Sequence, residues 1–78
     1  MDGEHLAVLA DAVKIQQRKE DLERAIGRSA RKAHKSFGFY VEIMSELREL
    51  ATSRKVDLDE AAKSLLADNE HGGNEGDQ

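Results

Sequence analysis

Apolar side chains recur at heptad spacing through the middle of the chain. From Ile26 onward, successive apolar positions lie alternately four and three residues apart, at Ile26, Ala30, Ala33, Phe37, Tyr40, Met44, Leu47 and Ala51. Such a stripe follows one side of an α-helix and is typical of a coiled-coil seam. Good helix formers dominate residues 4–53, and Asp2 is suited to cap a helix that starts there. The pattern predicts α-helix over about 4–53, in one piece or two.

The heptad pattern does not extend upstream of Ile26, so the long helix has candidate breaks. Traced back, the seam would pass through Glu23 and Lys19, which are not seam residues. A stutter in one helix or a break near Gly27 would explain this change. Gly38 is a second candidate break, because glycine weakens a helix interior and often follows a helix end. Neither glycine is accompanied by proline or a turn cluster, so we expect the helix to continue through at least one of them.

A shorter helix is predicted over about 58–68. Asp57 and Glu60 have the spacing of a capping box. One helical face then carries the apolar residues Leu58, Ala61, Ala62, Leu65 and Leu66. Residues 70–78 are glycines, acids, amides and one histidine, and we expect them to form a disordered tail. With no strand pattern present, residues 1–69 are predicted to form a single all-α domain.

The small size of the chain favours a dimer. Its 78 residues include no cysteine and no proline, and domains of this size usually need a disulfide, a metal or a partner subunit. A helix over 4–53 would be about 75 Å long, with little in its own chain to cover the seam. Antiparallel pairing around Gly38 would set Ala33 against Met44 and Ala30 against Leu47. We therefore predict a homodimeric coiled-coil-like bundle, with a hairpin turning at Gly38 as the alternative.

Charge is segregated along the sequence. The net charge is −4, yet residues 14–35 hold eight Lys or Arg and only three acids. No Asp or Glu occurs between Arg24 and Val41, and in the heptad frame this basic ridge lies outside the seam; its members are Arg24, Arg28, Arg31, Lys32 and Lys35. The ridge is a solvated helix face, a site for an acidic protein or a site for nucleic acid. The pI of about 5.3 and the lack of an aromatic stacking platform argue against nucleic acid.

A second candidate surface is apolar. The C-terminal half of the predicted long helix is broader in apolar residues than a two-stranded seam requires, with Phe39, Val41, Ile43 and Leu50 outside the stripe. The simpler interpretation is that the helix predicted at 58–68 packs there. The functional interpretation is a face that binds another protein through aromatic and aliphatic anchors.

The sequence offers no catalytic, cofactor-binding or metal-binding residues. His5, His34 and His71 are far apart and have no partner at diagnostic metal-ligand spacing. No serine is paired with an evident base, and there is no glycine-rich phosphate loop. No apolar run approaches the roughly 18 residues of a membrane helix, and the acidic N-terminus is unlike a signal peptide. We expect a cytoplasmic, non-enzymatic protein with no small-molecule substrate and no membrane partner.

These patterns lead to three functional hypotheses. The first is a homodimeric adaptor or regulator that binds an unidentified protein through its apolar helix face. The alternative is a dimer that binds DNA or RNA through the ridge from Arg24 to Lys35. A second alternative is a structural subunit of a larger helical assembly.

Overall fold

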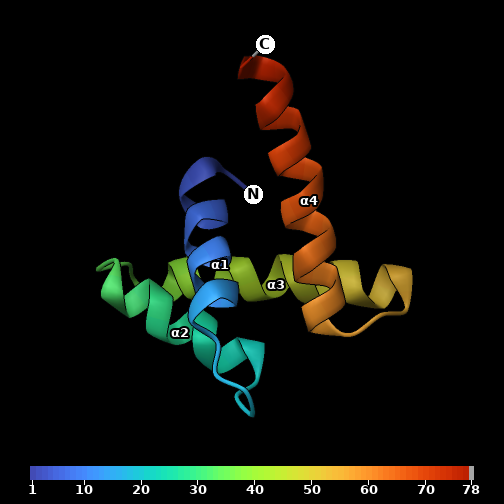
Figure 1. Cartoon of the computed structure of the whole chain (residues 1–78). Helices are drawn as coiled ribbons and strands as arrows, with labels where there is room; N and C mark the ends of the chain where they lie inside the picture. Colours follow the sequence, from blue (N-terminus) through green and yellow to red (C-terminus); the bar gives the residue numbers. More distant parts are fainter. Residues whose placement is uncertain (78) are drawn as a thin grey trace.

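The computed structural model describes the backbone of residues 1–77 and the side chains of residues 1–69. This part of the chain forms four α-helices and no strand: α1 (Gly3–Ile15), α2 (Leu22–Lys32), α3 (Phe37–Arg54) and α4 (Leu58–Asp77). In Figure 1, α1 and α4 both lie across α3, and α2 packs beside α1. The all-α prediction is therefore confirmed. Within the described residues, no helix has both the length and the apolar character that spanning a membrane requires.

Each helix begins at a side chain that accepts a hydrogen bond from its first turn. The Asp2 carboxylate accepts from the backbone N–H of His5 (3.1 Å), and Asp57 accepts from that of Glu60 (2.8 Å), as their spacing predicted. Two further caps were not predicted. Asp21 starts α2 by accepting from Arg24, and Ser36 starts α3 by accepting from Phe39. These caps place the breaks of the chain at 16–21 and 33–36.

The C-terminal ends of α2 and α3 are formed by left-handed residues that are not glycine. His34 has φ 59° and Lys55 has φ 58°. Directly after them, the N–H of Lys35 donates to Ala30 O (2.9 Å) and the N–H of Val56 donates to Ala51 O (3.0 Å). These bonds satisfy carbonyls that the ending helix leaves open.

The predicted helix over 4–53 is therefore corrected to three helices. Gly27 lies inside α2 and Gly38 inside α3, and neither has positive φ. The chain turns instead at the two polar segments that end in Asp21 and Ser36, whose side chains cap the helices that follow. The second segment also contains the left-handed residue His34. The hairpin at Gly38 is not formed.

The predicted heptad seam is interrupted by the second turn. Five of its members are buried in the core, namely Ile26, Ala30, Met44, Leu47 and Ala51. Ala33 lies exposed in the turn, and Phe37 is 77% exposed. The molecule measures 35 × 30 × 25 Å, far shorter than the roughly 75 Å of a single helix. The homodimer was predicted because the predicted seam needs a partner, but α1 and α4 cover it within one chain. That reason for a homodimer is therefore removed, and the homodimer itself stays a prediction.

The predicted apolar face of α4 packs as expected. Ala61 and Ala62 are fully buried, and Leu58, Leu65 and Leu66 pack against the core. The helix runs to Asp77, whereas the sequence predicted an end near 68 and a disordered tail over 70–78. The side chains of that tail, and Gln78 altogether, lie outside the described residues.

Candidate functional site

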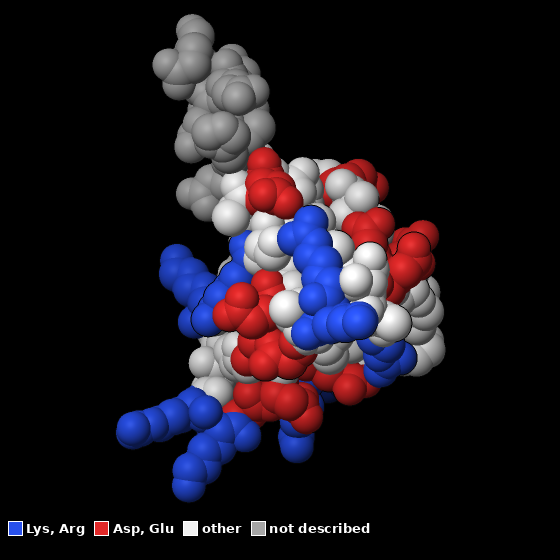
Figure 2. Space-filling view, turned by 90° about the vertical axis from the view of Figure 1, so that its right-hand side faces the viewer, with Lys and Arg blue, Asp and Glu red and all other residues white. Residues whose placement is uncertain are grey.

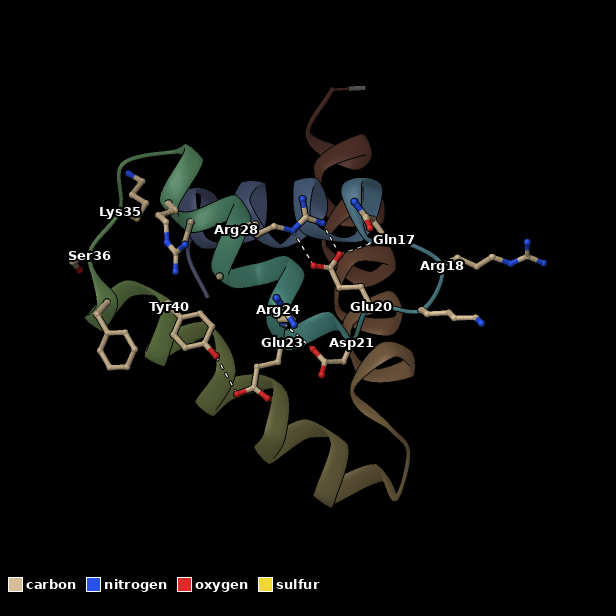
Figure 3. Close-up of a pocket in the computed structure, with 15 residues that line it drawn as sticks. Gln17, Arg18, Glu20, Asp21, Glu23, Arg24, Arg28, Lys35, Ser36 and Tyr40 are labelled. Atoms are coloured by element: carbon tan, nitrogen blue, oxygen red, sulfur yellow. Dashed lines mark hydrogen bonds and ion pairs between the residues drawn. The ribbon is translucent and has the colours of Figure 1, made fainter.

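A groove lined by charged and aromatic side chains lies between the loop 16–21, α2 and the first turn of α3 (Figure 3). Its basic residues are Arg18, Lys19, Arg24, Arg28, Arg31 and Lys35, and its acidic residues are Glu20, Asp21 and Glu23. Four of the five members of the predicted basic ridge thus lie on this groove. The fifth, Lys32, lies on the side of α2 that faces α1, beside Asp11.

Arg28 holds the loop rather than facing solvent as a free cation. Its Nε lies 2.9 Å from Oε2 of Glu20, and the same guanidinium donates to Ile15 O at 3.1 Å. Glu20 also accepts from the backbone N–H of Gln17 at 3.0 Å. The hydrogen bond from Arg28 lowers the pKa of Glu20, and that of Arg28 is raised in return. Arg28 therefore ties α2 to the end of α1.

Two other ridge residues are paired with acids of α1. Lys32 Nζ lies 3.2 Å from Asp11, and Lys35 Nζ lies 2.7 Å from Glu4. Figure 2 shows another side of the molecule, where acidic and basic side chains also lie next to each other. Basic and acidic residues that are segregated along the sequence thus form ion pairs between segments of the folded chain. The ridge is not one unpaired stripe, as the sequence had indicated.

Arg24 and Arg31 are the ridge residues that remain exposed without an acidic partner among the described side chains. Glu23, next to Arg24, is already engaged, because it accepts from the Tyr40 hydroxyl (3.1 Å) and from Arg48 (3.2 Å). Of the loop cations, Arg18 extends away from the groove in Figure 3. The positive charge open to a ligand along α2 therefore comes from two arginines.

An aromatic pair forms the α3 side of the groove. The rings of Phe37 and Tyr40 are 5.6 Å apart between centroids and inclined by 33°. Tyr40 is partly buried, and burial together with its bond to Glu23 raises the pKa of its hydroxyl. Phe37 is exposed because it is the first residue of α3, just after the turn. The heptad pattern had predicted Phe37 to lie in the seam; the serine directly before it, which caps α3, was the signal that could have indicated otherwise.

The four candidate protein-binding residues face mostly inward. Ile43 is fully buried, and Leu50 packs against the core. Phe39 stacks on His5, with ring centroids 4.0 Å apart. Only Val41, at 39% exposure, belongs to the set of exposed large hydrophobic residues. The broad apolar face is covered by the other helices of the chain, which was the simpler of the two interpretations of this face.

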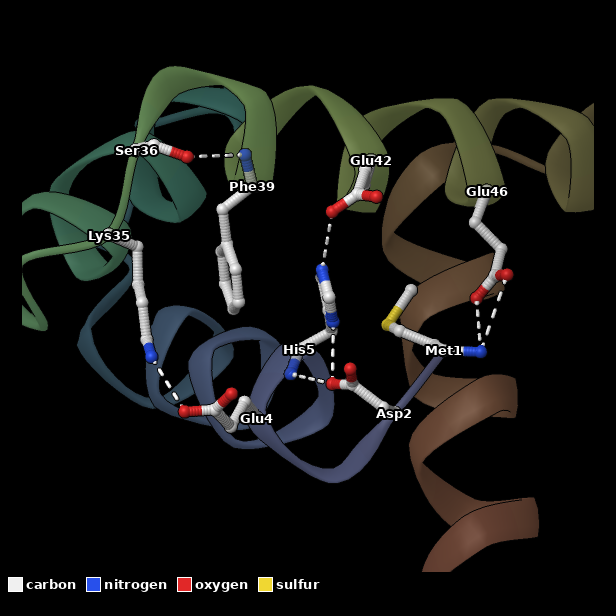
Figure 4. Close-up of polar contacts among 9 residues, drawn as sticks. All are labelled: Met1, Asp2, Glu4, His5, Lys35, Ser36, Phe39, Glu42 and Glu46. Atoms are coloured by element: carbon white, nitrogen blue, oxygen red, sulfur yellow. Dashed lines mark hydrogen bonds and ion pairs between the residues drawn. The ribbon is translucent and has the colours of Figure 1, made fainter.

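A second cluster surrounds His5 (Figure 4). Its Nδ1 lies 2.6 Å from Asp2 and its Nε2 lies 2.9 Å from Glu42, and the side chain is 14% exposed. Burial lowers the pKa of His5, but the hydrogen bonds to the two carboxylates outweigh it and the pKa is raised overall. Both ring nitrogens are engaged, so the cluster links helices. Among the described residues, no group of three or more His, Asp or Glu is arranged to hold a metal ion.

Comparisons with known proteins add no family to this description. A scan against protein-family models finds no match, and searches of curated proteins and of solved structures find none either. The functional interpretation therefore depends on the groove beside α2 and on the surfaces described above.

Proposed function

We propose that this chain is a small non-enzymatic adaptor or regulator that binds an acidic segment of another protein in the groove beside α2. One observation carries the proposal. Two exposed arginines without an acidic partner in the described part of the chain, Arg24 and Arg31, share the groove with the exposed ring of Phe37. A guanidinium matches a carboxylate in geometry, and an exposed aromatic ring offers a large apolar contact.

The proposed surface differs from the apolar face expected from the sequence. The sequence pointed to a side of α3 that faces inward in the fold. The proposed contact surface is instead formed by α2 and by the exposed first turns of α3. Val41 lies one helical turn after Phe37 and both are exposed, so α3 presents a second apolar side chain on the same helical face, beyond the groove. Aromatic and arginine side chains together are the residue types most enriched at binding hot spots.

The charge of the chain favours an acidic protein over a nucleic acid. The net charge is −4, and the groove itself contains Glu20, Asp21 and Glu23. A phosphate backbone carries closely and evenly spaced negative charges, which would meet these acids as well as the arginines. A protein segment can place single carboxylates opposite Arg24 and Arg31 and leave neutral residues elsewhere.

One observation favours nucleic acid as a second candidate. The turn 33–36 joins α2 to α3 through a left-handed residue, His34, as in helix-turn-helix units that read DNA. Against it, the first three turns of α3 carry none of the Arg, Lys, Asn or Gln side chains that contact base edges. The acidic-protein proposal therefore stands first.

Fluorescence anisotropy separates these candidates. Three labelled probes are titrated with the protein at about 50 and about 200 mM salt: a peptide of glutamate, alanine and leucine, a DNA duplex and a single-stranded RNA. The test variant is Arg24→Glu/Arg31→Glu. The matched control is Lys14→Glu/Lys63→Glu, which makes the same change in net charge at exposed lysines outside the groove.

The proposal predicts that the peptide binds wild type and the control but not the test variant. Binding of DNA or RNA that falls steeply with salt and is lost only in the test variant would instead establish the nucleic-acid candidate. Equal loss in both variants would mean that only net charge matters, and would refute a specific site. Absence of peptide binding to wild type would refute the proposal outright.

The homodimer and the larger assembly are separate proposals with their own measurement. Sedimentation of the protein over about 5–500 µM distinguishes them. A constant dimer mass supports the homodimer, and species that grow with concentration support the structural subunit. A monomer throughout would refute both, and the groove on α2 would then act in a single chain.

A further inference from the structure

Between Arg24 and Arg31, the groove side of α2 has a gap in its side chains at Gly27, which we call the bare strip, with Arg28 beside it. Gly27 lies between the two arginines on the same helical face, three residues after the first and four before the second. A methyl group placed on Gly27 would approach only Tyr40 Cε1, at 3.9 Å, which is an ordinary contact. Because Gly27 lacks a side chain, the backbone of a bound segment can lie close to α2 at this point.

The one cation next to this bare strip is already neutralised. Arg28 is bonded to Glu20 through both Nε and a terminal nitrogen, and Figure 3 shows its guanidinium turned toward the loop. A third carboxylate at the centre of a ligand would meet Glu20 as well as Arg28. The strip therefore favours charge at its two ends and a neutral centre.

The separation of the two ends sets the spacing of the ligand's charges. Arg24 and Arg31 are seven residues apart on α2, which is about 10 Å along the helix axis, and they share one face. An extended chain in the polyproline II conformation rises about 3.1 Å per residue and has three residues per turn. Residues three positions apart then lie on one face, about 9 Å from each other. A helical ligand would need seven residues to cover the same distance.

We infer that the groove binds an extended segment of a partner protein in which two acidic residues are three positions apart and a neutral pair separates them, with an apolar side chain beyond them that contacts Phe37. This rests on the proposed function and specifies its ligand. The exposed ring of Phe37 follows Arg31 at the α3 end of the groove, so the apolar residue flanks the acidic pair on that side.

Three labelled ten-residue peptides of identical composition test the spacing. They are Leu-Ala-Ala-Glu-Ala-Ala-Glu-Ala-Ala-Leu, with the acids three apart; Leu-Ala-Ala-Ala-Glu-Glu-Ala-Ala-Ala-Leu, with the acids adjacent; and Leu-Glu-Ala-Ala-Ala-Ala-Ala-Ala-Glu-Leu, with the acids seven apart. Leucine at both ends allows either chain direction. Each is titrated with the intact protein by anisotropy.

A peptide that meets both arginines makes one more surface ion pair than a peptide that meets one. The three-apart peptide is therefore expected to bind about three- to fivefold more tightly than the adjacent one. Equal or tighter binding of the adjacent peptide would overturn the spacing while leaving the proposed function intact. Tightest binding of the seven-apart peptide would overturn the extended conformation. No binding of any peptide would refute the proposed function as well.

A pair of glycine variants tests the bare strip without removing charge. Gly27→Met places a side chain on the strip, and Gly38→Met makes the same change at a helical glycine that does not line the groove. Loss of the three-apart peptide's advantage in the first variant alone supports the inference. Retention of that advantage in a folded Gly27→Met protein, checked by circular dichroism, would overturn the proposed path of the ligand.

Discussion

The imidazole of His5 in α1 bonds to the carboxylate of Glu42 in α3, with Nε2 2.9 Å from Oε1. The other ring nitrogen lies 2.6 Å from Oδ1 of Asp2, the residue that caps α1. Only a protonated imidazole can donate from both nitrogens, so the two carboxylates favour the imidazolium form. The Phe39 ring stacked on His5 lies under Lys35, which in turn pairs with Glu4. The start of α1 is thus tied to α3 by charge and by stacking.

The first prediction is that the protein loses stability when His5 loses its proton. Its pKa is raised in the folded protein, so the folded state holds the proton more tightly than the unfolded chain does. The stabilisation is complete below the unfolded value of about 6.5 and disappears as the pH rises through the raised value. Urea denaturation should therefore give a larger free energy of unfolding at about pH 6 than at about pH 8.5.

The variant His5→Gln isolates this effect, because it keeps a hydrogen-bonding side chain without a proton that titrates. We expect it to remove the difference between the two pH values. His34→Gln, at the exposed turn after α2, serves as the control and should retain the difference. An unchanged pH dependence in His5→Gln would assign it to other groups. Asp2, Asp11 and Glu20, whose pKa values are lowered, contribute only at more acidic pH.

The helix ends explain why the sequence predicted the fold class but not the path of the chain. Asp2 and Asp57 were recognised as caps because an acidic side chain preceded a helical pattern. Ser36 was overlooked because the heptad spacing continues across the second turn, and Asp21 because the first turn, without proline or glycine, consists mainly of helix formers. The chain turns with His34 and Lys55 in left-handed conformation, where glycine is the usual residue. Local propensity alone cannot identify such positions.

The candidate site was predictable only in part for the same reason. The cluster of basic residues in α2 was visible in the sequence, and four of its members line the groove. Lys32 and Lys35 are paired because Asp11 and Glu4 come next to them when α1 folds back along α2. The exposure of Phe37 likewise depends on the turn before it. Contacts between segments distant in sequence decide both features.

The second prediction concerns the left-handed residue that ends α3. A residue with a Cβ atom pays about 1 kcal/mol for this conformation, which glycine adopts freely. Lys55→Gly is therefore expected to raise the free energy of unfolding by about 1 kcal/mol relative to Lys55→Ala, measured by urea denaturation. Lys63→Gly, the same substitution inside α4, should instead lower the free energy of unfolding by about 1 kcal/mol relative to Lys63→Ala. Destabilisation by both glycines would contradict the left-handed conformation.

The third prediction concerns the glycine inside α2. Gly27 has ordinary helical geometry and room for a methyl group beside Tyr40. Gly27→Ala should raise the free energy of unfolding by about 0.5–1 kcal/mol, because alanine is the better helix former and restricts the unfolded chain. Thermal and urea denaturation both report this change. A loss of stability would indicate that α2 is interrupted at this residue.

The last prediction concerns Ser29, the one buried polar residue among those whose side chains the structure describes. Ser29 is 1% exposed, and its hydroxyl lies 2.8 Å from Asp11 Oδ2 and 3.0 Å from Val8 O. The hydroxyl has a single proton, so it donates to one of these acceptors at a time, and the charged oxygen is both nearer and stronger. Ser29→Ala should therefore reduce the free energy of unfolding by about 1 kcal/mol, the net value of an internal hydrogen bond.

The same substitution has a second, independent consequence. The bond from Ser29 is the largest cause of the lowered pKa of Asp11, ahead of the pairing with Lys32. In Ser29→Ala the pKa of Asp11 should rise toward its ordinary value, as a carboxyl NMR titration would show. Ser45→Ala, the same change at an exposed position of α3, should leave that pKa unchanged and should not reduce stability, because alanine is the better helix former. A stability loss without a change in the Asp11 titration would mean that Ser29 acts through packing, and that the hydroxyl is directed to Val8 instead.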